Sequence, residues 1–312
     1  EALAPLLRDK YVERCMFCTD DKHPSDLLEK GHIDYIAREA INKYGVDPII
    51  AVKAACHHAS RYFLLNNRGA IAPGYLADFA VIDNFKDFNV EMVFKKGVLY
   101  WNNGELRDFD APQIEEYLDK RAHDTFHVAT LTPDDFRDTR QRGVLGMVPG
   151  EIITTDNGYA DHVDLEKDIL KIAVVERHKG THHIGLGYIQ GYGLRSGAVA
   201  TSISHDSHNI IVVGTNSADM AFAANYIVEH HGGIVVVENS VVKGLVVLEI
   251  AGIMSDRPLT EINTELEAAK TAAFDLGVSR GIDPFMTLSF MALPVIPTLR
   301  ITTRGVVDVV TQ

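Results

Sequence analysis

The chain has 312 residues, and its 46% hydrophobic and 23% charged residues are ordinary for a soluble globular protein. Its length allows about two or three compact domains, and no apolar run reaches the ~18 residues that a membrane-spanning helix needs. The formal net charge of −13 disfavours nucleic acid as a partner, because an acidic surface repels phosphate backbones.

The first part of the chain has the pattern of a strand followed by helices. Residues 14–18 form a short apolar run that ends at an acidic turn, as a buried parallel strand does at its carboxyl end. Apolar residues at helical spacing predict a helix over 32–44, with Gly45 as its C-terminal cap. A second helix is expected to begin at Pro48, because proline fits the first helical turn.

The middle of the chain has a different sequence pattern. Between residues 65 and 105, turn-forming residues separate short strand-like runs, so we expect a small all-β unit. One strand is predicted at 79–82, and the runs 92–94 and 98–101 are predicted to form a hairpin. Residues 106–165 have weak periodicity and are interpreted as a connector with a few strands.

Residues 166–312 have the pattern of a complete α/β domain with its own core. Apolar runs predict strands at 172–175, 210–213, 234–237 and 245–250. Helices are expected at about 217–230, with Ser217 as the cap, and at about 259–276.

The cysteines indicate the cellular compartment. Cys15, Cys18 and Cys56 are few and odd in number, and no signal peptide precedes them, which favours a reducing cytoplasm. Cys15 and Cys18 are three apart in an apolar run, where side chains point to opposite faces of a strand. We therefore expect free thiols and not a structural zinc site.

The first candidate for chemistry is the acidic turn after residue 18. Barrel enzymes place catalytic carboxylates at the carboxyl ends of buried strands. Asp20 has the oxygen chemistry of a metal ligand and can also accept a proton from a metal-bound water. The alternative interpretation is that Asp20 and Asp21 cap the helix that follows.

Two further segments, 176–183 and 204–209, are dense in groups that donate, accept or bind metal. The alternative is a pair of polar loops with solvated histidines, and the residues alone do not decide between the two. The candidates are Glu176, His178, His205, Asp206 and His208.

Four segments carry a resemblance to the adenine deaminase family. Residues 17–28 resemble the eighth barrel strand of that family and the loop after it. Residues 69–79, with the pattern Gly-x-Ile-x-x-Gly-x-x-Ala-Asp, are similar to the return from an amidohydrolase barrel into its small β-domain. Residues 200–216 and 283–297 are similar to the C-terminal domain that is peculiar to adenine deaminases.

The resemblance implies a fold of α/β type with an additional β part. Residues 1–64 would be the terminal βα unit of a metal-dependent (β/α)8 amidohydrolase barrel, and residues 65–105 a segment of the small β-domain. Residues 106–165 would be the connector, and residues 166–312 the α/β C-terminal domain of an adenine deaminase.

The resemblance also implies hydrolysis of adenine to hypoxanthine at a divalent metal centre, with manganese or iron, binuclear in the complete enzyme. Asp20 would be a metal ligand and proton shuttle, with Asp21 as the alternative. The other ligands are expected outside this chain, which starts at Glu1 inside an apparent helix. We therefore expect a portion of a longer protein that carries part of the site and is inactive by itself.

In that family Glu176, His178, His205, Asp206 and His208 would contact substrate or support the residues that do. The rival interpretations are another amidohydrolase, such as a cytosine deaminase or a cyclic-amide hydrolase, and a non-catalytic binding or assembly module. Beyond the small substrate adenine, we expect no nucleic acid or membrane partner, a cytoplasmic location and a homo-oligomer.

Overall fold

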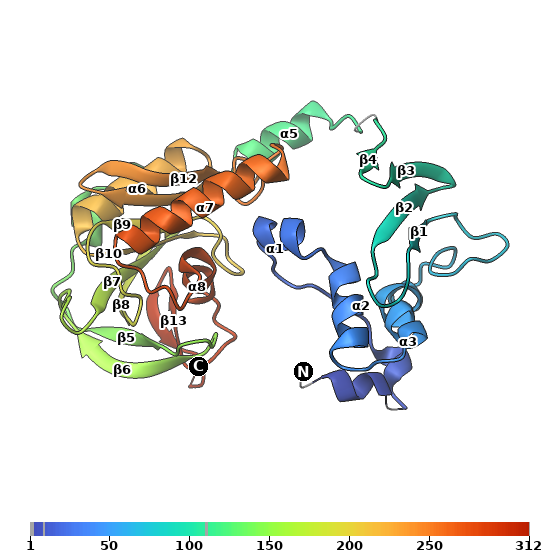
Figure 1. Cartoon of the computed structure of the whole chain (residues 1–312). Helices are drawn as coiled ribbons and strands as arrows, with labels where there is room; N and C mark the ends of the chain where they lie inside the picture. The colour runs from blue at the N-terminus through green and yellow to red at the C-terminus, as the bar shows by residue number, and fades with distance from the viewer. Residues whose placement is uncertain (1–2, 9, 110–111, 312) are drawn as a thin grey trace. The chain divides into compact units, whose positions relative to one another are not determined.

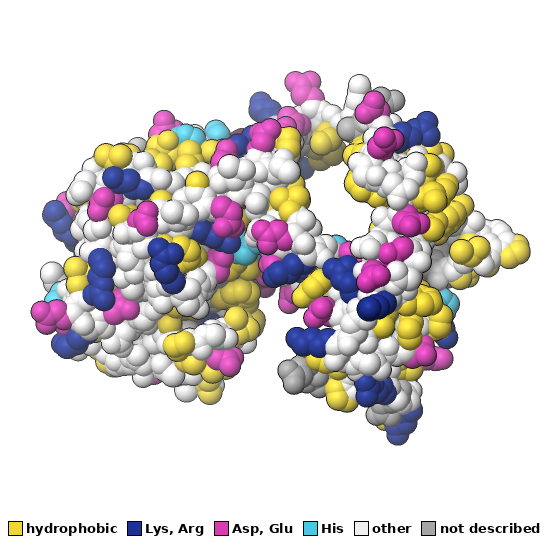
Figure 2. Space-filling model, in the orientation of Figure 1, with side chains coloured by type: hydrophobic (Ala, Val, Ile, Leu, Met, Phe, Trp, Pro, Cys, Tyr) yellow, Lys and Arg dark blue, Asp and Glu magenta, His cyan; other side chains and the backbone are white. Residues whose placement is uncertain are grey.

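The computed structural model describes residues 3–8, 10–109 and 112–311, which form two compact units, Glu1–Gln113 and Ile114–Gln312 (Figure 1). The helices and the three sheets of the described residues give the mixed α/β class that the sequence predicts. No helix within the described ranges is long and apolar enough to cross a membrane. Figure 2 shows Lys and Arg side chains interspersed with Asp and Glu over the visible face of each unit.

The first unit begins with helical segments and ends with a four-stranded sheet. Its helical elements are η1 (Ala4–Arg8), η2 (Val12–Arg14), α1 (Pro24–Glu29), α2 (Ile33–Asn42), α3 (Pro48–Val52), η3 (Lys53–His57) and α4 (His58–Tyr62). Its strands are β1 (Phe79–Ile82), β2 (Val90–Lys95), β3 (Val98–Asn102) and β4 (Glu105–Leu106), antiparallel in the order β1-β2-β3-β4.

The predicted helices of the first unit are confirmed. The glycine after the first of them and the proline at the start of the second also lie where the sequence predicts. Gly45 follows α2 with φ of +62°, the left-handed conformation that glycine adopts without steric cost. At α3, the Asp47 side chain accepts hydrogen bonds from the amides of Ile49 and Ile50 at 2.9 and 3.2 Å. The two helices pack around a small core that includes Ala40 and Ala51.

The predicted strand over 14–18 is wrong. Arg14 ends η2, and residues 15–20 have no strand pairing; the Phe17 amide donates a hydrogen bond to Ala54 O at 3.0 Å. A run of apolar residues becomes a strand only where a neighbouring strand accepts its hydrogen bonds. The described residues provide no such neighbour for this segment.

The second unit is built on an eight-stranded sheet. Its strands are β5 (Arg142–Met147), β6 (Thr154–Ala160), β7 (Ile169–Val175), β8 (Ile184–Gln190), β9 (Ala198–Thr201), β10 (Ile210–Gly214), β11 (Gly233–Glu238) and β12 (Val241–Val247), in the order β12-β11-β9-β10-β7-β8-β5-β6. All neighbours are antiparallel except β5 and β8. Thus β5 and β6, which lie inside the expected connector, extend this sheet.

Helices cover both faces of that sheet (Figure 1). The remaining elements are α5 (Glu116–His123), η4 (Pro133–Phe136), α6 (Ser217–Glu229), α7 (Leu259–Asp275), α8 (Pro284–Phe290) and the hairpin β13 (Leu299–Thr302) and β14 (Gly305–Asp308). In β7, Ile172 and Val174 face the core under α7 and α8, whereas Ala173 and Val175 face the core under α6. Burial on both faces explains why the strand sequences are continuously apolar.

The cap of α6 is Asn216, one residue before the expected Ser217. Its side-chain oxygen accepts a hydrogen bond from the Asp219 amide at 2.8 Å, and the backbone of Asn216 is extended. Asparagine is as good an N-cap as serine, so local preference alone did not distinguish the two positions.

A buried carboxylate before β5 makes the stability of the second unit depend on pH. The Asp138 side chain is 6% exposed and pairs with Arg140 at 3.0 Å and Arg142 at 2.5 Å. Burial by itself would raise the pKa of Asp138, but hydrogen bonds from the two arginines outweigh it and hold the pKa below the usual range. Because the folded-state pKa is depressed, this contribution is present above the unfolded pKa and is lost as pH falls.

We expect Asp138→Asn to lower the free energy of unfolding by about 1–3 kcal/mol at pH 7, and by progressively less as pH falls from about 5 to 2. Urea unfolding of the wild type and of the variant at about pH 7 and about pH 2 measures the loss of free energy of unfolding at each pH. The control is Asp134→Asn, because the Asp134–Arg137 pair is 78% and 71% exposed and should contribute little. An equal loss for Asp138→Asn at both pH values would contradict the assigned cause.

Candidate functional site

The acidic turn of the first unit leaves Asp20 accessible. Asp20 and Asp21 are both exposed, and Asp20 has φ of +54°, a conformation that non-glycine residues adopt infrequently. The helix α1 begins at Pro24 with His23 in the N-cap position, so neither carboxylate occupies that cap. Beside them, Thr19 Oγ1 lies 3.2 Å from His32 Nε2, which ties the turn to the start of α2.

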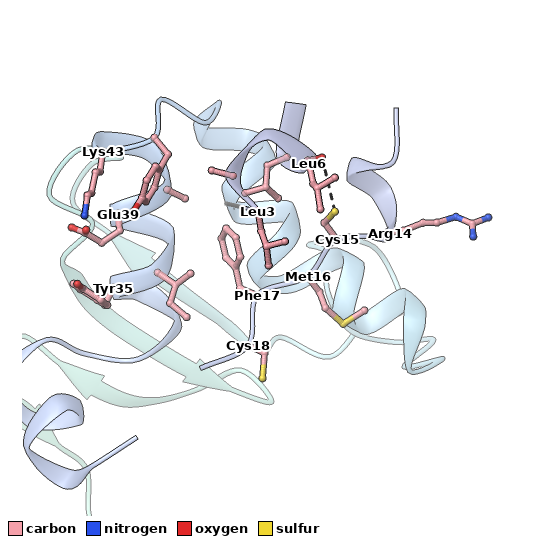
Figure 3. A pocket seen from close by; sticks show the side chains of 15 residues that line it. Leu3, Leu6, Arg14, Cys15, Met16, Phe17, Cys18, Tyr35, Glu39 and Lys43 are labelled. Carbon is pink, nitrogen blue, oxygen red and sulfur yellow. Dashed lines mark hydrogen bonds between the residues drawn. The ribbon is translucent and has the colours of Figure 1, made fainter. Parts of the chain in front are cut away.

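A cavity of about 660 Å³ lies along the segment that leads to this turn. Figure 3 shows the side chains that line it, which come from residues 3–7, 14–18 and 35–44. Phe17 and Met16 give it an apolar lining, and Glu39 and Lys43 lie among its charged residues. Asp20 is not among the lining residues, so this cavity does not contain the candidate metal ligand.

The described residues do not form a metal site by themselves. Among them, no group of three or more His, Cys, Asp or Glu side chains is arranged to hold a metal ion. Asp20 provides one carboxylate with the hard oxygen atoms that divalent cations prefer. Asp20 therefore suits the role of one ligand of a divalent metal.

In the second unit, Glu176 follows β7 and organises its own loop. Its carboxylate accepts hydrogen bonds from the amides of His178 (2.6 Å), Lys179 (3.0 Å) and Thr181 (3.2 Å), and from Thr181 Oγ1 (2.9 Å). Burial would raise the pKa of Glu176, but the hydrogen bonds of Thr181 and of the amides lower it on balance. These hydrogen bonds engage the Glu176 carboxylate in stabilising the loop 176–181.

The second candidate segment, the loop 204–209, lies beside the first. The Nε2 atom of His178 donates a hydrogen bond to Ser207 O at 2.8 Å, and the amide of Arg177 donates to Asn209 Oδ1 at 3.2 Å. Thus the structure brings His178 together with the loop that carries the other histidine candidates, although the two segments are far apart in the sequence.

Within that loop, His205 and His208 face one another. Their ring centroids are 6.3 Å apart, and the His205 ring packs on Phe290 of α8 at 4.9 Å. The Nδ1 atom of His208 is buried and has no hydrogen-bond partner among the described residues. Asp206 points its carboxylate to solvent, with 84% of the side chain exposed.

Burial lowers the pKa of His208, and the nearby His205, Arg177 and His178 lower it further, against an opposite contribution from Asp206. A lowered pKa favours the neutral imidazole, which has one ring nitrogen that can accept a hydrogen bond. An accepting imidazole on a polar loop suits contact with an amino group or a ring N–H.

A cavity of about 370 Å³ lies beside one of these candidates. The side chains that line it are those of Lys120, Arg121, Asp124, Thr125, His127 and His178. Of the sequence candidates in the second unit, only His178 is among them.

One residue at the centre of this region was missed from the sequence. Arg177 is 2% exposed and bonds to the loop 204–209, to residue 125 and to residue 251. The only local signal was an arginine directly after a continuous apolar strand, and that signal says nothing about acceptors supplied by distant loops.

Comparison with known proteins matches both units. The family model described as adenine deaminase C-terminal domain matches residues 150–312, and the amidohydrolase family model matches residues 1–100. The adenine deaminase of Nitratidesulfovibrio vulgaris strain Hildenborough is 41% identical over 321 residues, covering 98% of this chain and 54% of that protein.

Other relatives match to a similar degree. The adenine deaminase of Petrotoga mobilis is 41% identical over 320 residues, covering 99% of this chain and 55% of that protein. The adenine deaminase of Kosmotoga olearia is 41% identical over 328 residues, with the same coverages. The chain thus spans about half the length of the curated relatives it matches.

Proposed function

Because the chain belongs to the adenine deaminase family, we propose that it supplies part of the active site of an enzyme that hydrolyses adenine to hypoxanthine and ammonia. The observation that carries the proposal is the match of the adenine deaminase C-terminal domain to residues 150–312. The amidohydrolase match to residues 1–100 supports hydrolysis as the reaction type. Since the relatives are about twice as long, the proposed activity belongs to the longer protein.

For the fold, we propose that residues 1–64 are the last βα unit of a (β/α)8 barrel, with the small β-domain segment at 65–105. The connector that we expected at 106–165 is proposed to end before β5, because β5 and β6 belong to the sheet of the C-terminal domain. The apolar segment that leads to Asp20 and the helices that follow it support the first assignment. Lateral pairing with a neighbouring barrel strand would convert this segment into a regular strand.

We further propose that Asp20 is one ligand of a divalent metal, manganese or iron, in a binuclear centre whose other ligands lie outside the described residues. Its exposure and its place directly after the apolar segment support this role. Asp21, the adjacent exposed carboxylate, is the alternative. A divalent metal, when bound, would lower the pKa of the attacking water to about 7.

In the proposed reaction, water adds to C6 of adenine and the amino group leaves. The Asp20 carboxylate accepts a proton from the water and delivers it to the departing nitrogen, so that adenine and water give hypoxanthine and ammonia. Proton transfer by a positioned group of this kind contributes about 10²–10⁴-fold to the rate.

The second unit is proposed to add polar contacts to the substrate or to support the residues that make them. His208 is the strongest candidate for a contact, because its buried Nδ1 accepts no hydrogen bond from the described residues. His205 and Asp206 share its loop. His178 and Glu176 suit a supporting role, because their side chains bond to backbone groups of the loops 204–209 and 176–181.

Another amidohydrolase activity is the rival, and a substrate panel distinguishes the two. A protein that carries this chain and the remaining length of its relatives is assayed with Mn²⁺ for ammonia release from adenine, adenosine, cytosine and a cyclic amide. We expect kcat/KM for adenine to exceed that for cytosine by at least about 100-fold. Faster release from cytosine would reject the proposal.

The same protein tests the remaining proposals, a homo-oligomer in the cytoplasm that binds neither nucleic acid nor membrane. The net charge of −13 supports the expectation that nucleic acid is not a partner. Light scattering measures the oligomeric state, and a monomeric mass would reject the oligomer.

A further inference from the structure

Arg177 joins three separate loops through one buried guanidinium group. Its Nη1 donates to Thr125 O at 3.0 Å and to Thr125 Oγ1 at 3.1 Å, and its Nη2 donates to Ala251 O at 2.8 Å. Its Nε donates to His208 O. The guanidinium also lies over the ring of Phe126, 4.2 Å from the centroid.

Every one of these acceptors is a neutral oxygen. No described carboxylate forms an ion pair with Arg177, although the side chain is almost fully buried, and burial lowers its pKa to about 10. Taking a charge out of water is costly, and an apolar side chain of similar volume would avoid that cost. The planar guanidinium, however, directs donors in several fixed directions at once, which no apolar side chain does.

The loop 204–209 is held at three consecutive residues by this strand end. Ser207 O accepts from His178 Nε2, His208 O accepts from Arg177 Nε, and Asn209 Oδ1 accepts from the Arg177 amide. On its other side, the His205 amide donates to Ser289 O of α8 at 3.3 Å. The loop is therefore fixed from both sides, and Arg177 provides two of the contacts.

We infer that Arg177 is a positioning residue, which fixes the loop 204–209 and so orients the imidazoles of His205 and His208 toward the substrate. The inference rests on the proposed function, because the orientation of the two imidazoles affects the reaction only if they contact the substrate. Its geometric part concerns this chain alone and is testable without turnover.

The test uses Arg177→Met and Arg177→Lys in this chain, with Arg300→Met as the matched control. Arg300 is 0% exposed, and its guanidinium also bonds to neutral carbonyls, those of Ile152 at 2.6 Å and Pro297 at 3.3 Å. Burial lowers its pKa to about 10 as well. A general effect of removing a buried arginine therefore appears in both proteins.

Histidine ring NMR signals followed against pH provide the readout. The charged or titratable groups near His208 are His205, Arg177, His178 and Asp206. We expect Arg177→Met to shift the ring signals of His205 and His208 and to raise the pKa of His208, because a neighbouring positive charge is removed. Arg177→Lys should shift the ring signals with less change in pKa, since lysine keeps the charge but cannot make the three-way contact. Arg300→Met should leave both rings unchanged.

In the longer protein, we expect Arg177→Met to lower kcat by about 10–100-fold, because small misplacements of the groups that contact the substrate are costly. The free energy of unfolding should be nearly the same for Arg177→Met and Arg300→Met. Unchanged ring signals in a folded Arg177→Met or Arg177→Lys protein would overturn the inference. If wild-type longer protein does not deaminate adenine, the proposed function fails, whereas the NMR comparison still decides the positioning role. If adenine is deaminated and kcat is unaffected by Arg177→Met, the function stands and the inference fails.

Discussion

Replacing Asp20 by asparagine is expected to lower kcat for adenine by about 10²–10⁴-fold in the longer protein that includes this chain. Asparagine keeps the size of the side chain but cannot accept the proton that the reaction has to move. It is also a weaker ligand for a divalent cation. The expected result is therefore a loss of both turnover and bound metal, with unfolding unaffected because the side chain is exposed.

Asp21→Asn is the matched control, because Asp21 is the neighbouring residue and is also exposed. Ammonia release at saturating adenine gives kcat, and elemental analysis gives the metal content. We expect Asp21→Asn to change kcat by less than about tenfold. The reverse pattern would transfer the role to Asp21, and full activity in both variants would exclude this turn from the chemistry.

A large effect on stability is expected at Gly197, which directly precedes β9. Its φ is +78°, and a Cβ atom built there would lie 2.0 Å from Val237 O. That oxygen belongs to β11, whose pairing with β9 in the middle of the sheet leaves the backbone no room to retreat. We expect Gly197→Ala to lower the free energy of unfolding by about 3–5 kcal/mol, the sum of left-handed strain and overpacking.

The substitution Gly150→Ala separates left-handed strain from overpacking, because Gly150 has φ of +77° and a Cβ atom there would meet nothing within 4 Å. Gly150→Ala should therefore cost only the conformational part, about 1–2 kcal/mol. Urea unfolding of the two variants, with the same midpoint analysis, gives both values. Equal losses would mean that the close approach to Val237 is relieved by a shift of the turn.

The parts of the fold that the sequence predicted are those fixed by local pattern. The helix over 32–44 and the strand at 172–175 depend on which residues are apolar and on their spacing, and both are present. The strand β6 was hidden because most of its residues, Thr154–Ala160, lie outside the core at the edge of the sheet. A polar edge strand carries no apolar alternation to detect.

The parts that could not be predicted depend on contacts distant in the sequence. Residues 14–18 have the composition of a buried strand, but pairing, not composition, makes a strand. Arg177 gave no sign of its role because its acceptors come from residues 125, 208 and 251, which only the folded chain brings together. The histidines of 204–209 were recognisable as a cluster, but their orientation required the surrounding loops.

The most direct test of the central proposal measures hypoxanthine formed from adenine in the presence of Mn²⁺, for two proteins side by side. One is this chain alone, and the other is this chain joined to the remaining length of its relatives. We predict hypoxanthine and an equal amount of ammonia from the longer protein and none from the shorter. Turnover by the 312-residue chain alone would contradict the idea of a shared site, and silence from both proteins would contradict the assignment of adenine as substrate.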